Sequence, residues 1–166
     1  MTTCVFADPE ELVVLNPSVK WSGLGDVLTG VAPSDPGHMR SRGDTITFRT
    51  GGARTWSQPH LTAHRLYQTV FMVLRGEATI EIAPRRDLRV VRRYCDLDDC
   101  EHLEGVGRPI RLGAARVVCV GLDDAWRVRD GDAVLCQARI TIEGAPLVPP
   151  AQRGARGEPA AMEGRA

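Results

Sequence analysis

The chain has 166 residues, which is the usual length of one domain. Its 21 Lys and Arg residues balance 21 Asp and Glu residues, so it lacks the basic excess of a nucleic-acid-binding or membrane-surface protein. No run of about 18 apolar residues predicts a membrane-spanning helix, and the acidic N-terminal segment does not resemble a signal peptide. The five cysteines have no CxxC spacing and favour free thiols, so we expect a cytoplasmic protein.

Helical signals are confined to the first thirty residues. A short helix is expected over residues 9–15, with Asp8 as its N-cap and Pro9 at its first position. Residues 20–29 predict another turn or two of helix.

The middle of the chain has the patterns of β-strands. Residues 44–49 alternate polar and apolar side chains, and residues 67–75 form a longer apolar run typical of a strand buried on both faces. Residues 77–83 alternate again, and Asp130-Gly131 suits a type I′ hairpin. Further strands are predicted at 88–94, 109–112, 115–120 and 133–142. Short strands separated by Gly and Pro turns indicate an all-β sandwich or barrel.

The C-terminal segment differs in composition from the rest. Residues 145–166 are rich in Pro, Gly, Ala and Arg and have no apolar period. Such a segment buries too little surface to offset the entropy of ordering it. We therefore predict an ordered domain over residues 1–144 and a disordered tail over 145–166.

The sequence shows little sign of a metal or nucleotide site. His60 and His64 are four residues apart, but no HExxH motif is present and no histidine follows His102. The acidic segment 96–102 is interpreted as a solvated loop, because adjacent residues seldom converge on one ion. No GxSxG, Walker or GxGxxG motif occurs.

Residues 59–84, PHLTAHRLYQTVFMVLRGEATIEIAP, and the following RRDLRVVRRYCDLDDCEHLEGVGRPIRL run in the order of a known family. The chain resembles the YhcH/YjgK/YiaL family, which includes the β-subunit of the evolved β-galactosidase. The likeness extends from about residue 37 to residue 142. It implies a cupin-like double-stranded β-helix, or jelly-roll barrel, with a role in sugar catabolism and, in some members, a bound metal.

The departures from that family pattern bear on the chemistry. His64 stands at the family's first histidine, but Thr62 replaces the glutamate ligand and Trp126 replaces the late histidine. Thr69 and Phe71 replace two further polar positions. Because one imidazole does not hold zinc or iron, we expect no metal and no other cofactor.

The remaining polar residues are the candidates for catalysis. His64 is a candidate general acid or base, because imidazole titrates near neutral pH. Tyr67 and Glu77 are candidate proton donors, Glu77 on the expectation that it faces an apolar cavity. Each residue also has a non-catalytic interpretation. His64 would be a hydrogen-bonded core residue, Tyr67 a packing residue and Glu77 an exposed turn residue. The substrate would be bound by Arg65, Thr62, Thr69, Phe71 and Trp126, with Trp126 as a stacking wall.

Three functions remain open at this stage. The first is a metal-independent isomerase, lyase or cyclase that holds a largely apolar, polyketide-like intermediate in the barrel. The second is the family's metal-dependent sugar isomerase or epimerase. The third is a non-catalytic binding module or partner subunit. A small-molecule substrate and a homodimer formed through edge strands are the expected partners, with no nucleic acid and no membrane.

Overall fold

The computed structural model describes residues 3–34, 37–144 and 146–150. Twelve strands of the described chain form two six-stranded antiparallel sheets. Sheet A has the order β1 (Cys4–Phe6), β10 (Val117–Cys119), β5 (Tyr67–Arg75), β12 (Val134–Thr141), β3 (Ile46–Gly52), β2 (Arg40–Arg42). Sheet B has the order β7 (Arg89–Cys95), β8 (Cys100–Glu104), β4 (Leu61–Ala63), β11 (Asp124–Val128), β6 (Ala78–Pro84), β9 (Arg108–Leu112).

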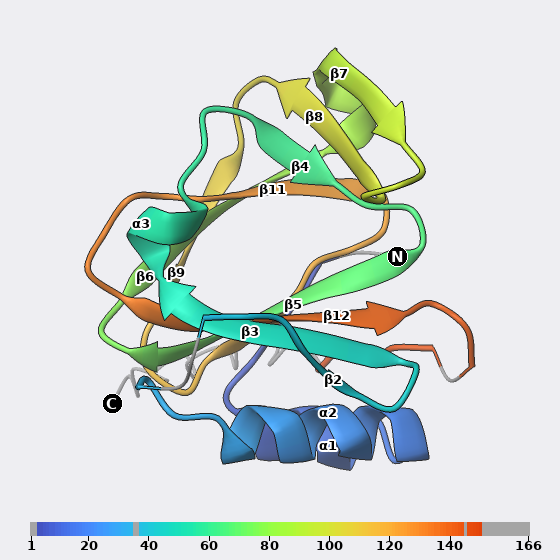
Figure 1. Ribbon diagram of the computed structural model, residues 1–166, viewed down its shortest axis with the longest axis vertical. Coiled ribbons are helices and arrows are strands. Elements are labelled where there is room, and N and C mark those ends of the chain that lie inside the picture. The colour runs from blue at the N-terminus through green and yellow to red at the C-terminus, as the bar shows by residue number, and fades with distance from the viewer. Residues whose placement is uncertain (1–2, 35–36, 145, 151–166) are drawn as a thin grey trace, which may run out of the picture.

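The two sheets face each other, and the helices lie outside them. In Figure 1, α1 (Pro9–Leu15) and α2 (Val19–Gly30) cover the outer face of sheet A, while sheet B lies on the opposite side of the molecule. The short helix α3 (Ala53–Trp56) follows β3, and a 3-10 turn (Arg85–Asp87) follows β6. This arrangement confirms the predicted all-β, cupin-like class. No helix in the described ranges is both long and apolar enough to cross a bilayer.

Strand periodicity divides the side chains between two cores. On β3, β5 and β12, alternate residues such as Ile46, Val70 and Ala138 pack against the helices. The intervening residues point between the sheets, where Phe71, Leu135 and Ile80 pack with Trp56 and Trp126. The predicted two-sided burial of β5 is confirmed, since six consecutive residues of this strand are buried. Sheet A is therefore covered on both faces.

Both predicted helices are present, and the second is longer than predicted. The Asp8 carboxylate accepts a hydrogen bond from the Glu11 amide at 2.8 Å, and Pro9 opens α1 as expected. The second helix runs for 12 residues rather than a turn or two. Ser18 caps it, and its buried face includes Trp21 and Leu24. Burial against sheet A supplies the stability that local propensity did not indicate.

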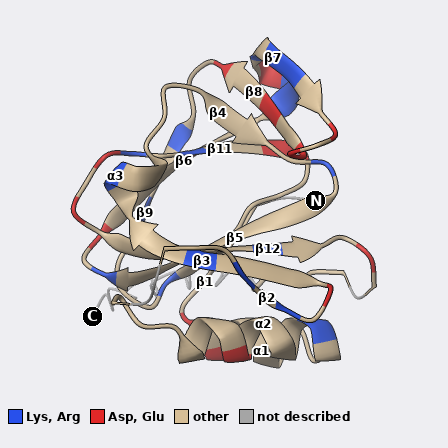
Figure 2. Cartoon of the chain, in the orientation of Figure 1, with Lys and Arg blue, Asp and Glu red and all other residues tan. Residues whose placement is uncertain are grey.

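Two predictions about connections are wrong. Residues 129–132 do not form a hairpin, because β11 and β12 belong to different sheets and this segment crosses between them. The acidic segment 96–102 is only partly solvated, because its second half enters β8, where Glu101 is buried, and Asp99 just before it is also buried. Figure 2 shows the resulting mixture of acidic and basic segments on β7 and β8.

The domain boundary also differs from the prediction. Leu147 is buried with the helix-facing core, and the Val148 carbonyl accepts a hydrogen bond from the Asn16 side chain at 3.2 Å. The packed region therefore continues past residue 144. The rest of the predicted tail, residues 151–166, lies outside the described residues, as does residue 145.

Candidate functional site

His64 is held at the end of β4 with one ring nitrogen occupied. Its Nδ1 donates to the carbonyl oxygen of Asp99. This contact fixes the neutral tautomer and leaves Nε2 as a proton acceptor. The residue is 5% exposed, and Nε2 is buried without a hydrogen-bond partner. A buried imidazole with one directed bond and one free lone pair is arranged to accept a proton or a hydrogen bond.

Asp99 organises the backbone around this histidine. Its carboxylate accepts hydrogen bonds from the Arg65 amide at 2.8 Å, the Leu66 amide at 3.1 Å and the Tyr94 hydroxyl at 2.8 Å. The Asp99 hydrogen bond raises the pKa of Tyr94 to about 12. The Asp99 backbone has φ 47°, a conformation that Asp tolerates better than most residues. Asp99 is therefore a positioning residue for the turn that carries His64.

A small cavity lies beside the imidazole. Its volume is about 10 Å³, room for about one water molecule, and His64, Tyr67, Thr69 and Trp126 line it together with residues 120–122 and 124. Thr69 Oγ1 and Trp126 Nε1 are buried and have no hydrogen-bond partner, like His64 Nε2. Both residues are under 5% exposed. Three residues that line this cavity thus each carry a buried polar atom without a partner: an acceptor, an N–H donor and a hydroxyl.

The surroundings keep His64 neutral. Burial lowers its pKa below the ordinary value, and the positive charge of Arg139 lowers it further. The Asp99 carbonyl and the Asp99 and Asp98 carboxylates oppose this shift but do not reverse it. A neutral imidazole at physiological pH can act as a base.

Of the predicted site residues, His64, Tyr67, Thr69 and Trp126 share the cavity. Phe71 is fully buried, and its ring meets Trp126 edge-on at 4.9 Å, so it packs behind the cavity wall. Thr62 is opposite Trp126 in the β4–β11 pairing, and its hydroxyl accepts a hydrogen bond from Gln58 at 2.7 Å. Both residues therefore support the site without lining the cavity.

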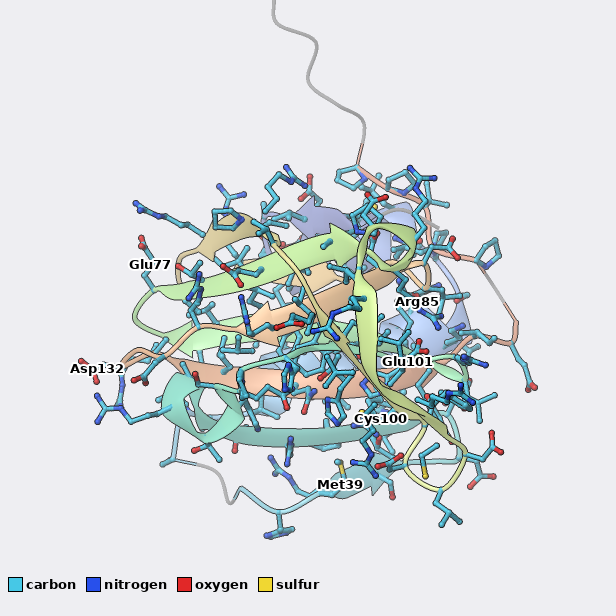
Figure 3. All side chains as sticks on the ribbon, turned by 90° about the horizontal axis from the view of Figure 1, so that it is seen from above. Met39, Glu77, Arg85, Cys100, Glu101 and Asp132 are labelled. Carbon is cyan, nitrogen blue, oxygen red and sulfur yellow. The ribbon has the colours of Figure 1, made fainter. Side chains whose placement is uncertain are left out.

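Arg65 and Glu77 do not join the site, and these two predictions are wrong. The Arg65 side chain is 49% exposed and stacks on the Tyr94 ring at 4.1 Å, outside the barrel. Residues on either side of a strand end point in opposite directions, so a buried His64 places Arg65 outward. Glu77 is exposed in the turn between β5 and β6, and Figure 3 shows it on the opposite side of the molecule from Cys100 and Glu101.

The metal site of the resembled family does not fit these residues. No group of three or more His, Cys, Asp or Glu side chains is placed to hold an ion in the described ranges. At the positions of the two missing ligands, Thr62 is engaged by Gln58, and Trp126 offers a donor N–H where a metal needs a lone pair. Besides His64, the one carboxylate that lines the cavity is that of Asp124, and it already accepts hydrogen bonds from Thr3.

Sequence reasoning missed Asp99, Gln58 and Arg139 at this site. Asp99 belongs to the acidic segment 96–102, for which the pattern predicts a solvated loop, although an Asp in a loop is a common cap for free backbone amides. Gln58 lies in the irregular segment after α3. Arg139 lies in a predicted strand, and its alternation with Ala138 and Ile140 was the available sign that it points away from the helix-facing core.

Comparison with known proteins adds a distant likeness. No known family profile matches the chain. A solved structure of hydroquinone 1,2-dioxygenase PnpCD, in complex with Cd2+ and 4-hydroxybenzonitrile, is 17% identical with a TM-score of 0.41. The alignment covers 69% of this chain and 68% of that chain. At this distance the likeness assigns no activity, and the class of the fold follows from the two sheets themselves.

Proposed function

We propose that the chain is a metal-independent isomerase, lyase or cyclase in which His64 moves a proton. The observation that carries this proposal is that His64, Thr69 and Trp126 line one cavity and that each has a buried polar atom without a partner. Buried polar atoms without partners are rare, because each forfeits its hydrogen bond to water. Their presence together at one place is the signature of a site that a ligand completes.

The chemistry follows from the donor and acceptor roles. Neutral His64 Nε2 accepts a proton from a carbon next to a substrate carbonyl, and the electron pair moves onto the carbonyl oxygen. The Trp126 N–H and the Thr69 hydroxyl are placed to donate hydrogen bonds to that oxyanion. The imidazolium then returns the proton to a different carbon, which gives an isomer. Departure of a leaving group instead gives a lyase. Neither step requires an oxidant or reductant.

The walls favour a substrate whose reacting part is largely apolar. Val120 and Leu122 line the cavity, and Phe71 closes the space behind Trp126. A polyketide-like intermediate has this character. The cavity holds about one water in the present conformation, so side chains around it must separate before such a substrate binds.

The proposal is tested by exchange of carbon-bound hydrogen in D2O. A panel of small ketones and keto acids is incubated with chelator-treated protein, and loss of C–H signals is followed by proton NMR. We expect exchange with the wild-type protein and none with His64→Gln. Glu77→Gln is the matched control, because Glu77 is exposed and distant, and it should exchange like wild type. Equal exchange by His64→Gln, or activity that chelation abolishes and added metal restores, would refute the proposal.

A non-catalytic partner subunit is a second candidate, favoured by the aromatic packing between the sheets. The ring of Phe71 packs there against Trp56 and Trp126. This candidate predicts a stable complex with a larger enzyme and no exchange with any panel member. Wild-type exchange that depends on His64 would exclude it.

A further inference from the structure

Two arginines point into the barrel beside the His64 cavity. On β3 and β12 the residues facing the helices are Ile46, Phe48, Ala138 and Ile140, so Arg49 and Arg139 face the opposite way, between the sheets. Arg139 is directly opposite Thr69 in the β12–β5 pairing, which places it next to the cavity-lining hydroxyl. Arg49 is opposite Gln137, which is itself opposite Phe71.

Neither guanidinium has an acidic partner among the described residues. Arg49 donates from Nε to the Gln137 side chain at 3.1 Å and lies over the Trp56 ring at 5.5 Å. Arg139 Nε is buried and has no hydrogen-bond partner. The positive charge of Arg139 contributes, after burial, to the lowered pKa of Arg49 and of His64.

Several other arginines of the described chain do have an acidic partner. Elsewhere Arg42 pairs with Asp26, Arg85 with Glu101, and Arg89 with Glu104. On the outer face of sheet B, Glu81 is bound by both Arg127 and Arg129. Two half-buried cations facing one interior without an anion are costly, because like charges repel and burial removes water. A bound anion would remove that cost.

We infer that Arg49 and Arg139 bind the carboxylate of the substrate, so that the substrate is a largely apolar carboxylic acid. This inference rests on the proposed function for the reacting part of the molecule and adds its anchoring group. A guanidinium matches a carboxylate through two parallel N–H bonds. With the carboxylate at Arg139, the rest of the molecule extends past Thr69 toward His64 Nε2, where proton transfer takes place.

Binding of simple probes tests the anchor without requiring turnover. Hexanoate, hexanamide and inorganic phosphate are titrated into the full-length protein by calorimetry. We expect hexanoate to bind at least about tenfold more tightly than hexanamide, since a charge-assisted hydrogen bond separates them. We expect Arg139→Gln to weaken hexanoate binding by a similar factor. The control Arg86→Gln, on a side chain that is 86% exposed, should leave binding unchanged.

Several outcomes would overturn the inference. They are equal binding of hexanoate and hexanamide by the wild-type protein, unchanged hexanoate binding by folded Arg139→Gln, and tighter binding of phosphate than of hexanoate. If Arg139→Gln does not fold, the affinities of the wild-type protein for hexanoate and hexanamide still test whether a carboxylate is bound. Hexanoate binding that persists in His64→Gln, without hydrogen exchange by wild type, would support the anchor and refute the proposed catalysis. Exchange by wild type on keto acids that Arg139→Gln retains undiminished, with equal binding of hexanoate and hexanamide, would support the catalysis and refute the anchor.

Discussion

Phe71→Ala tests whether the space between the sheets is packed or is an open ligand pocket. The Phe71 ring is fully buried, meets Trp126 at 4.9 Å and lies 6.4 Å from the Trp56 ring. Removing a fully packed phenyl ring costs about 3–5 kcal/mol, which combines lost transfer energy with the cavity left behind. At roughly 2–4 °C per kcal/mol for a domain of this size, the melting temperature should fall by about 6–20 °C.

The assay is urea unfolding of wild type, Phe71→Ala and Phe71→Leu, followed by fluorescence. Phe71→Leu keeps most of the volume and should cost less than Phe71→Ala. Leu97→Ala is the control, because Leu97 is 98% exposed and its loss should change stability by no more than about 0.5 kcal/mol. A loss under about 1 kcal/mol in Phe71→Ala would refute the reasoning, because it would show that one side of the ring faces empty space.

Three further predictions concern charge and assembly. Because burial and Arg139 lower the pKa of folded His64, unfolded His64 takes up a proton first, and the unfolding free energy should decrease as pH falls below about 6.5. The difference in unfolding free energy between wild type and His64→Gln, measured by urea unfolding, should decrease from pH 7.5 to pH 5. A difference that stays constant over this range would contradict the prediction. Burial raises the pKa of Glu81, but hydrogen bonds from Arg127 and Arg129 outweigh it and lower the pKa overall. The stability that Glu81 contributes is therefore present above its ordinary pKa and lost in acid. Glu81→Gln should lower the melting temperature more at pH 7 than at pH 3. An equal effect at both pH values would count against the ion pairs. A homodimer through edge strands remains a prediction; light scattering on a sizing column should give about twice 18.1 kDa, and a monomer mass at high concentration would exclude it.

A strand could be predicted where a single hydrophobicity pattern extended along the whole segment. Residues 67–75 form β5 with the predicted bounds, because a continuous apolar run of that length suits a strand covered on both faces. The short strands β4 and β11 had no such pattern. Leu61–Ala63 has only three residues, and Asp124–Val128 mixes a charge with a tryptophan, so their pairing in the sheet rather than local propensity makes them strands.

The candidate site was predicted in part, for a similar reason. His64, Tyr67, Thr69 and Trp126 were expected together, and they line one cavity. Glu77 was wrongly placed with them because a nine-residue strand separates its turn from Tyr67, and sequence proximity says nothing about which end of the barrel a turn occupies. Asp99 and Arg139 were missed because their roles depend on contacts across 35 residues or more.

The sequence by itself determined the all-β class and the capped first helix. These follow from the alternation of polar and apolar side chains and from capping chemistry, both of which are local properties. Only the tertiary structure decided that three residues with unpartnered polar atoms line one small cavity and that Arg49 and Arg139 face the space between the sheets without an acid. Burial, pairing and the distance between charges are properties of chain segments that meet only after folding, so no local pattern encodes them.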